Sequence, residues 1–283
     1  MADKPPSVLA ETEPLFALVP VLHRLLSPRR TVHLLVSADV VRLPFELQHT
    51  ILGAISIPVL VATGLSGEER AWALELPQLN THFAMLGNAQ RGMRSGVTTL
   101  TFVDEELRII SKGDTHTQIE SRQMCRAVPE YENPLSGEFD LAATISLPRP
   151  DLVALLSRPH SLEVGVQRLI VEGAQPLVRA SLTAGPSTLT VVKDENGADV
   201  SVPPELDVRT EDVVAPMTFP HHDIAHLTTA MACFSRMVLG FAPESGLLAV
   251  HACRCGPILF VPPHLTPPYS NGGELRALLS TQI

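Results

Sequence analysis

The stretch Val213–Pro263, VVAPMTFPHHDIAHLTTAMACFSRMVLGFAPESGLLAVHACRCGPILFVPP, decides the fold. It begins with the short apolar run Val214–Phe219, which predicts a strand. A helix is predicted next, because apolar residues recur at helical spacing at Ile224, Leu227, Met231 and Phe234. Turn signals then separate three more β-prone runs, at Arg236–Phe241, Gly246–Cys253 and Ile258–Val261. The order is strand, helix, and three strands.

The same order of elements recurs three times earlier in the chain, beginning near residues 8, 71 and 141. The predicted helices start near residues 15, 77, 149 and 220, so the repeat is longer than that of solenoid proteins and suits half-domains. The sequence therefore predicts an α+β protein with two similar domains, each built from two strand-helix-three-strand units. Pro20, inside the first helical run Leu15–Leu26, predicts a kink there or a later helix start near Val19.

Composition agrees with two folded domains and excludes some function classes. The chain has 283 residues, of which 45% are hydrophobic and 18% are charged. No apolar run reaches the ~18 residues that span a bilayer, so no membrane association is expected. The formal net charge of −9 is opposite to that of a typical nucleic-acid-binding domain. Four cysteines form no small-domain disulfide framework, which predicts free thiols.

Loops and connectors suggest domain boundaries. We expect an N-terminal domain over residues 1–126, a connector over 127–137, a C-terminal domain over 138–266 and a tail over 267–283. Within the tail, Leu275, Leu278 and Leu279 have helical spacing, so a short helix is predicted over Glu274–Ile283.

Three segments carry a resemblance to a known family. Gly256–Pro263 is an aromatic and apolar strand that ends at proline, and Leu141–Leu156 is a strand followed by Leu-Pro-x-x-x-Leu-x-x-Leu-Leu. Together with the repeated unit, they resemble the sliding DNA clamps of the proliferating cell nuclear antigen family. Within that family, Glu75–Gly92, and Phe83–Arg91 above all, is most similar to the Hus subunit of the heterotrimeric nine-one-one DNA-damage checkpoint clamp.

The resemblance implies a non-catalytic subunit of a heterotrimeric ring that encircles double-stranded DNA in the nucleus. It implies two paralogous clamp subunits, a clamp loader, and repair and checkpoint proteins as partners, and no cofactor. Helices line the hole of such a ring, which gives these candidate DNA-facing residues: His23, Arg24, Arg29, Arg30, Arg91, Arg94, Arg149 and Arg158. The second helix departs from the basic pattern of replicative clamps, because its expected inward positions are Asn80, Thr81 and Ala84.

Subunits of a ring pair through edge strands, since an unpaired edge exposes backbone N–H and C=O groups. The candidate interface residues lie on two strands predicted to be edges: Leu107, Ile109 and Ser111 on one, and Val178, Ala180 and Leu182 on the other. The segment Thr115–Pro134 corresponds to the family's interdomain connector, where client peptides dock.

Two alternatives stay open. A homotrimeric replicative or viral processivity clamp would keep the fold and change the assembly. A metal-dependent hydrolase would use His222 and His226, four residues apart on a predicted helix, with His251, Cys253 and Cys255 as further ligands. The histidine pair lacks the glutamate of a His-Glu-x-x-His motif, and no glycine-rich phosphate loop or nucleophile elbow occurs. A non-catalytic protein is therefore expected.

Overall fold

The computed structural model describes residues 4–26, 31–47, 51–65, 69–88, 91–113, 117–131, 143–156, 161–169, 177–194, 205–208, 214–219, 221, 225, 234, 236–242, 247–253 and 274–280. The chain divides into two units. Unit 1 comprises Met1–Leu47, Gly53–Leu135 and Tyr269–Glu274, and unit 2 comprises Gln48–Leu52, Ser136–Pro268 and Leu275–Ile283.

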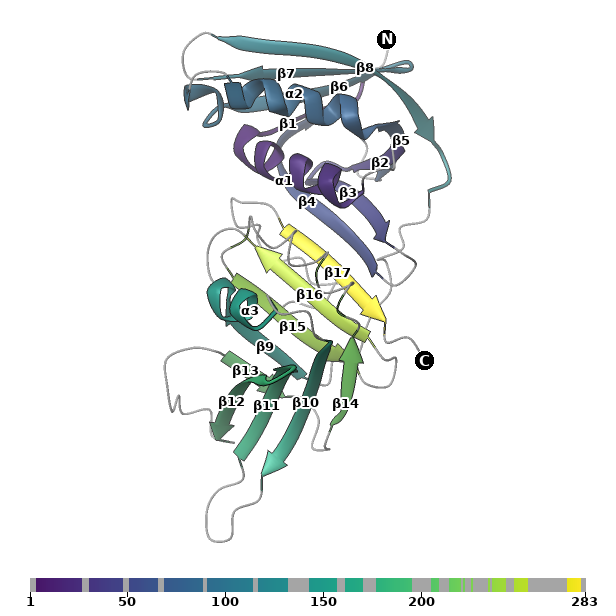
Figure 1. Ribbon diagram of the computed structural model, residues 1–283. Coiled ribbons are helices and arrows are strands. Elements are labelled where there is room, and N and C mark those ends of the chain that lie inside the picture. The colour runs from purple at the N-terminus through teal and green to yellow at the C-terminus, as the bar shows by residue number, and fades with distance from the viewer. Residues whose placement is uncertain are drawn as a thin grey trace. The chain divides into compact units, whose positions relative to one another are not determined.

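Unit 1 contains the first two repeats in the predicted order (Figure 1). The first repeat consists of β1 (Ser7–Glu11), α1 (Thr12–Leu25), β2 (Thr31–Val36), β3 (Val40–Leu47) and β4 (Ile51–Thr63). The second consists of β5 (Arg70–Glu75), α2 (Leu76–Asn88), the 3-10 turn η1 (Arg91–Met93), β6 (Val97–Val103), β7 (Glu106–Lys112) and β8 (Gln118–Val128).

The strands of unit 1 follow one another in the order β1-β6-β7-β8-β5-β2-β3-β4, and β4 also pairs with β1. Two long strands make this circuit possible by changing partner along their length. Strand β8 pairs with β7 through residues 118–124 and with β5 through residues 125–128. Strand β4 pairs with β1 at its far end, where Val61 lies opposite Leu9.

The core of unit 1 forms where alternating strand residues meet the two helices, which lie side by side (Figure 1). In β6 and β7 every second residue is buried, as expected for strands with one face on a core. Phe83 of α2 and Leu18 and Leu22 of α1 are fully buried. The rings of Trp72 and Phe102 stack at 4.0 Å between centroids, and both side chains are buried in the core.

Helix α1 is longer than its sequence predicts, since it starts at Thr12 and continues through Pro20. Proline removes one backbone hydrogen bond, at a cost of about 3 kcal/mol in an isolated helix. Burial compensates here, because the flanking residues Val19 and Val21 are both buried in the core. Tertiary packing therefore overrides the local helix-breaking signal.

Unit 2 repeats the pattern. Its third repeat consists of β9 (Ala143–Pro148), α3 (Arg149–Leu156), β10 (Leu162–Leu169), β11 (Leu177–Ala184) and β12 (Ser187–Asp194), followed by β13 (Glu205–Val208). The fourth contains β14 (Val214–Phe219), β15 (Arg236–Ala242), β16 (Leu247–Cys253) and β17 (Glu274–Ser280). His221 and Ala225 are helical, within the predicted fourth helix. The predicted strand Ile258–Val261 lies outside the described residues.

The strand pairings of unit 2 match those of unit 1. One sheet has the order β17-β16-β15-β9-β13 and the other has the order β12-β11-β10-β14. Strand β9 pairs with β15 as β1 pairs with β6, and β10 pairs with β11 and β14 as β2 pairs with β3 and β5. The duplication expected from the sequence is therefore a duplication of topology.

The predicted helix in the tail is wrong, because Glu274–Ser280 forms strand β17 next to β16. The segment ELRALLS also alternates, with Leu275, Ala277 and Leu279 on one side of an extended chain. A short helix is marginal by itself, whereas the edge of β16 offers a row of backbone partners. The segment could form a helix or a strand by its sequence, and pairing with the edge of β16 selects the strand.

Candidate functional site

The two helices of unit 1 present a nearly neutral face. On α2 the exposed residues are Gln78, Thr81, Ala84 and Met85, none of which is charged. On α1 the less buried positions recur every three or four residues, at Glu13, Phe16, Ala17, Pro20, His23 and Arg24. This stripe carries one carboxylate and one guanidinium. Of Asn80, Thr81 and Ala84, which the sequence predicts to face the hole of a ring, Thr81 and Ala84 are exposed and Asn80 is half-buried.

The predicted DNA-facing residues fall into three groups. Arg24 is exposed at the end of α1, and His23 beside it is half-buried. Arg94 is exposed in the turn after η1, with its guanidinium carbon 4.3 Å from the centre of the Phe16 ring, so the structure brings it to the α1 face. Arg91 and Arg149 are described in backbone only, and Arg29, Arg30 and Arg158 lie outside the described residues.

This arrangement limits what the helix face can do. Affinity for a phosphate backbone comes mainly from lysine and arginine contacts that release counterions. Among the described side chains of the two helices and the turn after η1, only Arg24 and Arg94 can make such contacts from the exposed face. Arg94 also has the Phe16 ring beneath it, which positions the charge through a cation–π contact. The face suits weak, sequence-independent contact with an anionic polymer.

Both strands that the sequence predicts as edges are internal, so the prediction that they are edge strands is wrong. Strand β7 pairs with β6 on one side and β8 on the other, and Leu107, Ile109 and Ser111 are buried. Strand β11, which carries Val178, Ala180 and Leu182, pairs with β10 and β12. The side chains on β7 and β11 alternate as they would in an edge strand or in an internal strand. The sequence alone therefore does not say which of several consecutive strands is outermost.

The free edges belong to the next strands along the chain. Strand β12 ends the four-stranded sheet of unit 2, and β8 pairs with both β7 and β5 but has one free edge over residues 118–124. On β8, the Cys125 N–H donates to the Glu105 carbonyl at 2.9 Å, so odd-numbered residues direct their N–H and C=O groups toward β7. The even-numbered residues from Gln118 to Met124 therefore point theirs away from β7. Over this stretch no other described strand pairs with them.

Charged side chains cover the outer face of β7 and β8. Arg108 donates to both carboxylate oxygens of Glu120, at 2.8 and 3.1 Å, and Arg122 donates to Glu120 at 3.2 Å. Arg122 also lies 3.7 Å from the Glu106 carboxylate. The hydrogen bond from Arg108 lowers the pKa of Glu120 below its usual value. This alternation of charged residues, Glu120, Arg122 and Arg126, was a signal in the sequence for an outer strand.

A chain of buried hydroxyl groups runs from α1 to β8, and sequence reasoning missed it. Thr12 bonds Thr98 at 2.9 Å, and Thr98 bonds Ser111 at 2.7 Å. The Ser111 hydroxyl then bonds His82 Nε2 at 2.9 Å, and His82 Nδ1 bonds Ser121 at 2.7 Å. His82 has no exposed surface, and burial lowers its pKa to about 4. A neutral histidine thus connects α2 to β7 and β8.

The structure offers no site for the metal-dependent alternative in the part it describes. No three His, Cys, Asp or Glu side chains of the described residues gather closely enough to hold a metal ion. His222, His226 and Cys255 lie outside those residues, while His251 and Cys253 belong to β16. Across the described helices, none has the length and apolar character needed to cross a membrane.

The two units, each with paired strand-helix-three-strand repeats, define a DNA-clamp fold of the α+β class. Among solved structures, the chain is similar to the crystal structure of proliferating cellular nuclear antigen from Entamoeba histolytica. The TM-score is 0.63 at 11% sequence identity, and the match covers 99% of this chain and 100% of that chain. At this identity the likeness establishes the fold alone. No protein-family model and no curated protein sequence matches the chain.

Proposed function

We propose that the chain is a non-catalytic subunit of a ring-shaped sliding clamp that encircles double-stranded DNA. The observation that carries the proposal is the unpaired edge of β8 over residues 118–124, in a chain with the clamp fold. A row of unpaired backbone N–H and C=O groups must hydrogen-bond to water or to another chain. Strands β8 and β12 are the surfaces that would pair with neighbouring subunits.

The composition of the helix face favours a heterotrimer over a homotrimer. In a homotrimer every subunit contributes the same surface, so a ring lined by this α1 and α2 would present few cations to DNA. In a heterotrimer two other subunits supply the positive charge. Together with the resemblance of Glu75–Gly92 to the Hus subunit, this supports a role in the nine-one-one checkpoint clamp. Clamp loading, a nuclear location and service as a platform for repair and checkpoint proteins belong to this proposal.

The decisive measurement is the mass of the chain in solution, alone and after co-expression with candidate clamp paralogues. Light scattering during gel filtration should find a monomer alone and a 1:1:1 complex with two paralogues. A stable homotrimer would instead support the replicative or viral clamp. A monomer that joins no paralogue would contradict the ring proposal.

Proline at position 122 should block the ring without unfolding unit 1. Arg122 directs its N–H away from β7, so Arg122→Pro removes a donor at the free edge and keeps the β7–β8 ladder. Arg122→Ala is the matched control, because it loses the same ion pairs with Glu120 and Glu106 but keeps the N–H. We expect Arg122→Pro to weaken complex formation about tenfold or more, since a buried unpaired carbonyl costs about 1–3 kcal/mol. Equal complex formation by the two variants would exclude β8 as an interface strand.

This subunit should contribute only a small part of the salt dependence of the complex's affinity for DNA. The double variant with Arg24→Ala and Arg94→Ala removes the two exposed cations of the α1 face. In the assembled complex, the slope of log affinity against log salt concentration should decrease by about 2, since each phosphate contact contributes about 0.9. Arg108→Ala, on the outer face of β7, should leave the slope unchanged. An equal change in both variants would argue against the helix face as the DNA-facing surface.

A further inference from the structure

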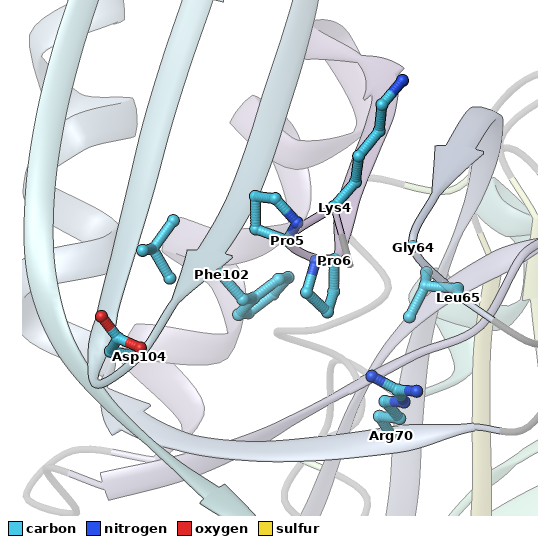
Figure 2. Close-up of a pocket in the computed structure, with 9 residues that line it drawn as sticks. Lys4, Pro5, Pro6, Gly64, Leu65, Arg70, Phe102 and Asp104 are labelled. Carbon is cyan, nitrogen blue, oxygen red and sulfur yellow. The ribbon is translucent and has the colours of Figure 1, made fainter. Parts of the chain in front are cut away.

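Unit 1 has a pocket of about 810 Å³ that the function proposed above does not use (Figure 2). Four segments form it: the chain before β1, the end of β4, the start of β5, and the turn between β6 and β7. The residues that matter here are Lys4, Pro6, Leu65, Arg70, Phe102 and Val103. Of the connector expected at 127–137, the described residues 127–131 do not line it.

The pocket is held in place by core contacts rather than by surface loops alone. Phe102 is buried and stacks on Trp72, which anchors the floor to the core. The Phe102 N–H donates to the Pro6 carbonyl at 2.9 Å, which ties the segment before β1 to β6. Gly64 forms part of the pocket wall and has a φ of 70°. A Cβ atom at this position would lie 2.6 Å from the Lys4 carbonyl oxygen, so the two segments approach closely. A pocket with a fixed shape costs little ordering entropy when a ligand binds.

Exposed apolar side chains lie on the outer face of the sheet, and one of them, Val103, lines the pocket. Val103 is 43% exposed and lies opposite Glu106, which lies opposite Met124, itself 64% exposed. Val61, 54% exposed, is on the same face through its pairing with Leu9. The described residues expose two further large apolar side chains, Leu60 at the bulge next to Val61 and Met85 on α2. Clustered exposed apolar groups mark protein interaction surfaces.

Two cations line this apolar site. Lys4 and Arg70 are both exposed, and neither forms an ion pair with another described residue. Figure 2 shows the Arg70 guanidinium directed toward Pro6 and Leu65, with Asp104 at the far end beyond Phe102. In a chain with a formal net charge of −9, two unpaired cations beside an apolar floor select for an anionic ligand with apolar groups.

We propose that this pocket binds a short extended peptide of a partner protein in which apolar side chains adjoin acidic residues. The apolar side chains lie against Phe102, Leu65 and Val103, a carboxylate reaches Arg70, and Lys4 adds positive charge at the rim. Apolar contacts carry the affinity, because burial of a leucine or phenylalanine side chain removes a large apolar surface from water. The two cations disfavour basic sequences. The proposal does not depend on ring formation.

Two synthetic peptides with identical apolar residues test the charge requirement on the full chain. The acidic probe is acetyl-Leu-Phe-Asp-Glu-Asp-amide and the basic probe is acetyl-Leu-Phe-Lys-Arg-Lys-amide, each followed by NMR titration of the labelled protein. We expect the acidic probe to bind about tenfold more tightly, which corresponds to about 1.4 kcal/mol. Its shift changes should centre on Phe102, Val103 and Arg70. Equal binding of the two probes, shift changes elsewhere, or no binding would overturn the proposal.

Variants separate the pocket from the rest of the surface. Arg70→Glu and Val103→Asp, both at exposed positions, should each weaken binding of the acidic probe about fivefold to tenfold. Arg24→Glu is the control, because it makes the same charge reversal on α1. All three variants should keep the thermal stability of the chain, and Arg70→Glu should still join the three-chain complex. Unchanged binding by Arg70→Glu and Val103→Asp would exclude the pocket, whatever the outcome for the ring.

Discussion

Lowering the pH from 7 to 4 is expected to destabilise unit 1 by about 3 kcal/mol through His82 alone. In its neutral form the fully buried ring makes two hydrogen bonds, one with Ser111 and one with Ser121. One ring nitrogen donates and the other accepts. Burial lowers its pKa from 6.5 to about 4, so in this range the unfolded chain binds a proton that the folded chain does not. Stability is therefore constant above pH 6.5 and falls as the pH decreases toward 4.

Urea unfolding between pH 7.5 and 4.5, followed by tryptophan fluorescence, measures this dependence. Trp72 is the single tryptophan and is buried in the core of unit 1, so it reports on that unit. The control is His82→Gln, which keeps one donor and one acceptor but does not titrate. Burial also lowers the pKa of His33, and that contribution remains in the control. The difference between the two proteins should thus decrease as the pH falls, and a constant difference would mean that His82 is not buried in its neutral form.

Gly96→Ala is expected to destabilise unit 1 by about 3 kcal/mol, at the upper end of overpacking effects. A Cβ atom at position 96 would lie 1.8 Å from the Lys112 carbonyl oxygen and 2.7 Å from its carbon. Both are backbone atoms of β7, and they cannot move without disturbing the pairing of Lys112 with Val97. The Gly96 carbonyl also accepts the Thr12 N–H at 3.0 Å, at the start of α1. One methyl group therefore disturbs a strand pair and a helix terminus together.

Gly92→Ala provides a matched comparison four residues away. Its added Cβ atom would meet nothing within 4 Å, so we expect a change within about 0.5 kcal/mol. Urea unfolding at pH 7.5 gives both values, and amide hydrogen exchange of α1 shows whether the helix start is affected. Similar stabilities for the two variants would mean that the approach of Gly96 to Lys112 is looser than the structure has it.

The order of elements could be read from the sequence because it depends on local patterns. Leu79, Phe83 and Leu86 recur at helical spacing, and all three are buried in α2. Alternation in Val97–Val103 and Glu106–Lys112 predicts strands, and the pair Asp104-Glu105 forms the turn between them, where Asp104 takes φ 53°. Each of these features involves residues close in sequence, for which side-chain periodicity is a direct signal.

Features that depend on contacts between distant segments could not be predicted in this way. The segment Glu274–Ser280 fits both a helix and a strand, and pairing beside β16 selects the strand. The chain of buried hydrogen bonds from Thr12 to Ser121 joins residues up to 109 positions apart. Each serine or threonine in it, taken by itself, is an ordinary polar residue. The pocket at Phe102 joins four segments that only the β1–β6 and β1–β4 pairings bring together.

By itself, then, the sequence determined the repeated strand-helix-three-strand order, the α+β class, the resemblance to sliding clamps and the uncharged outer face of α2. These follow from periodicity and composition, which are properties of neighbouring residues. Only the tertiary structure decided that β8 and β12 carry the free edges, that β7 and β11 are internal, and that His82 is buried in neutral form. The physical reason is that edges, burial and pockets depend on which distant segments pair, and side-chain alternation alone does not fix which strands become neighbours.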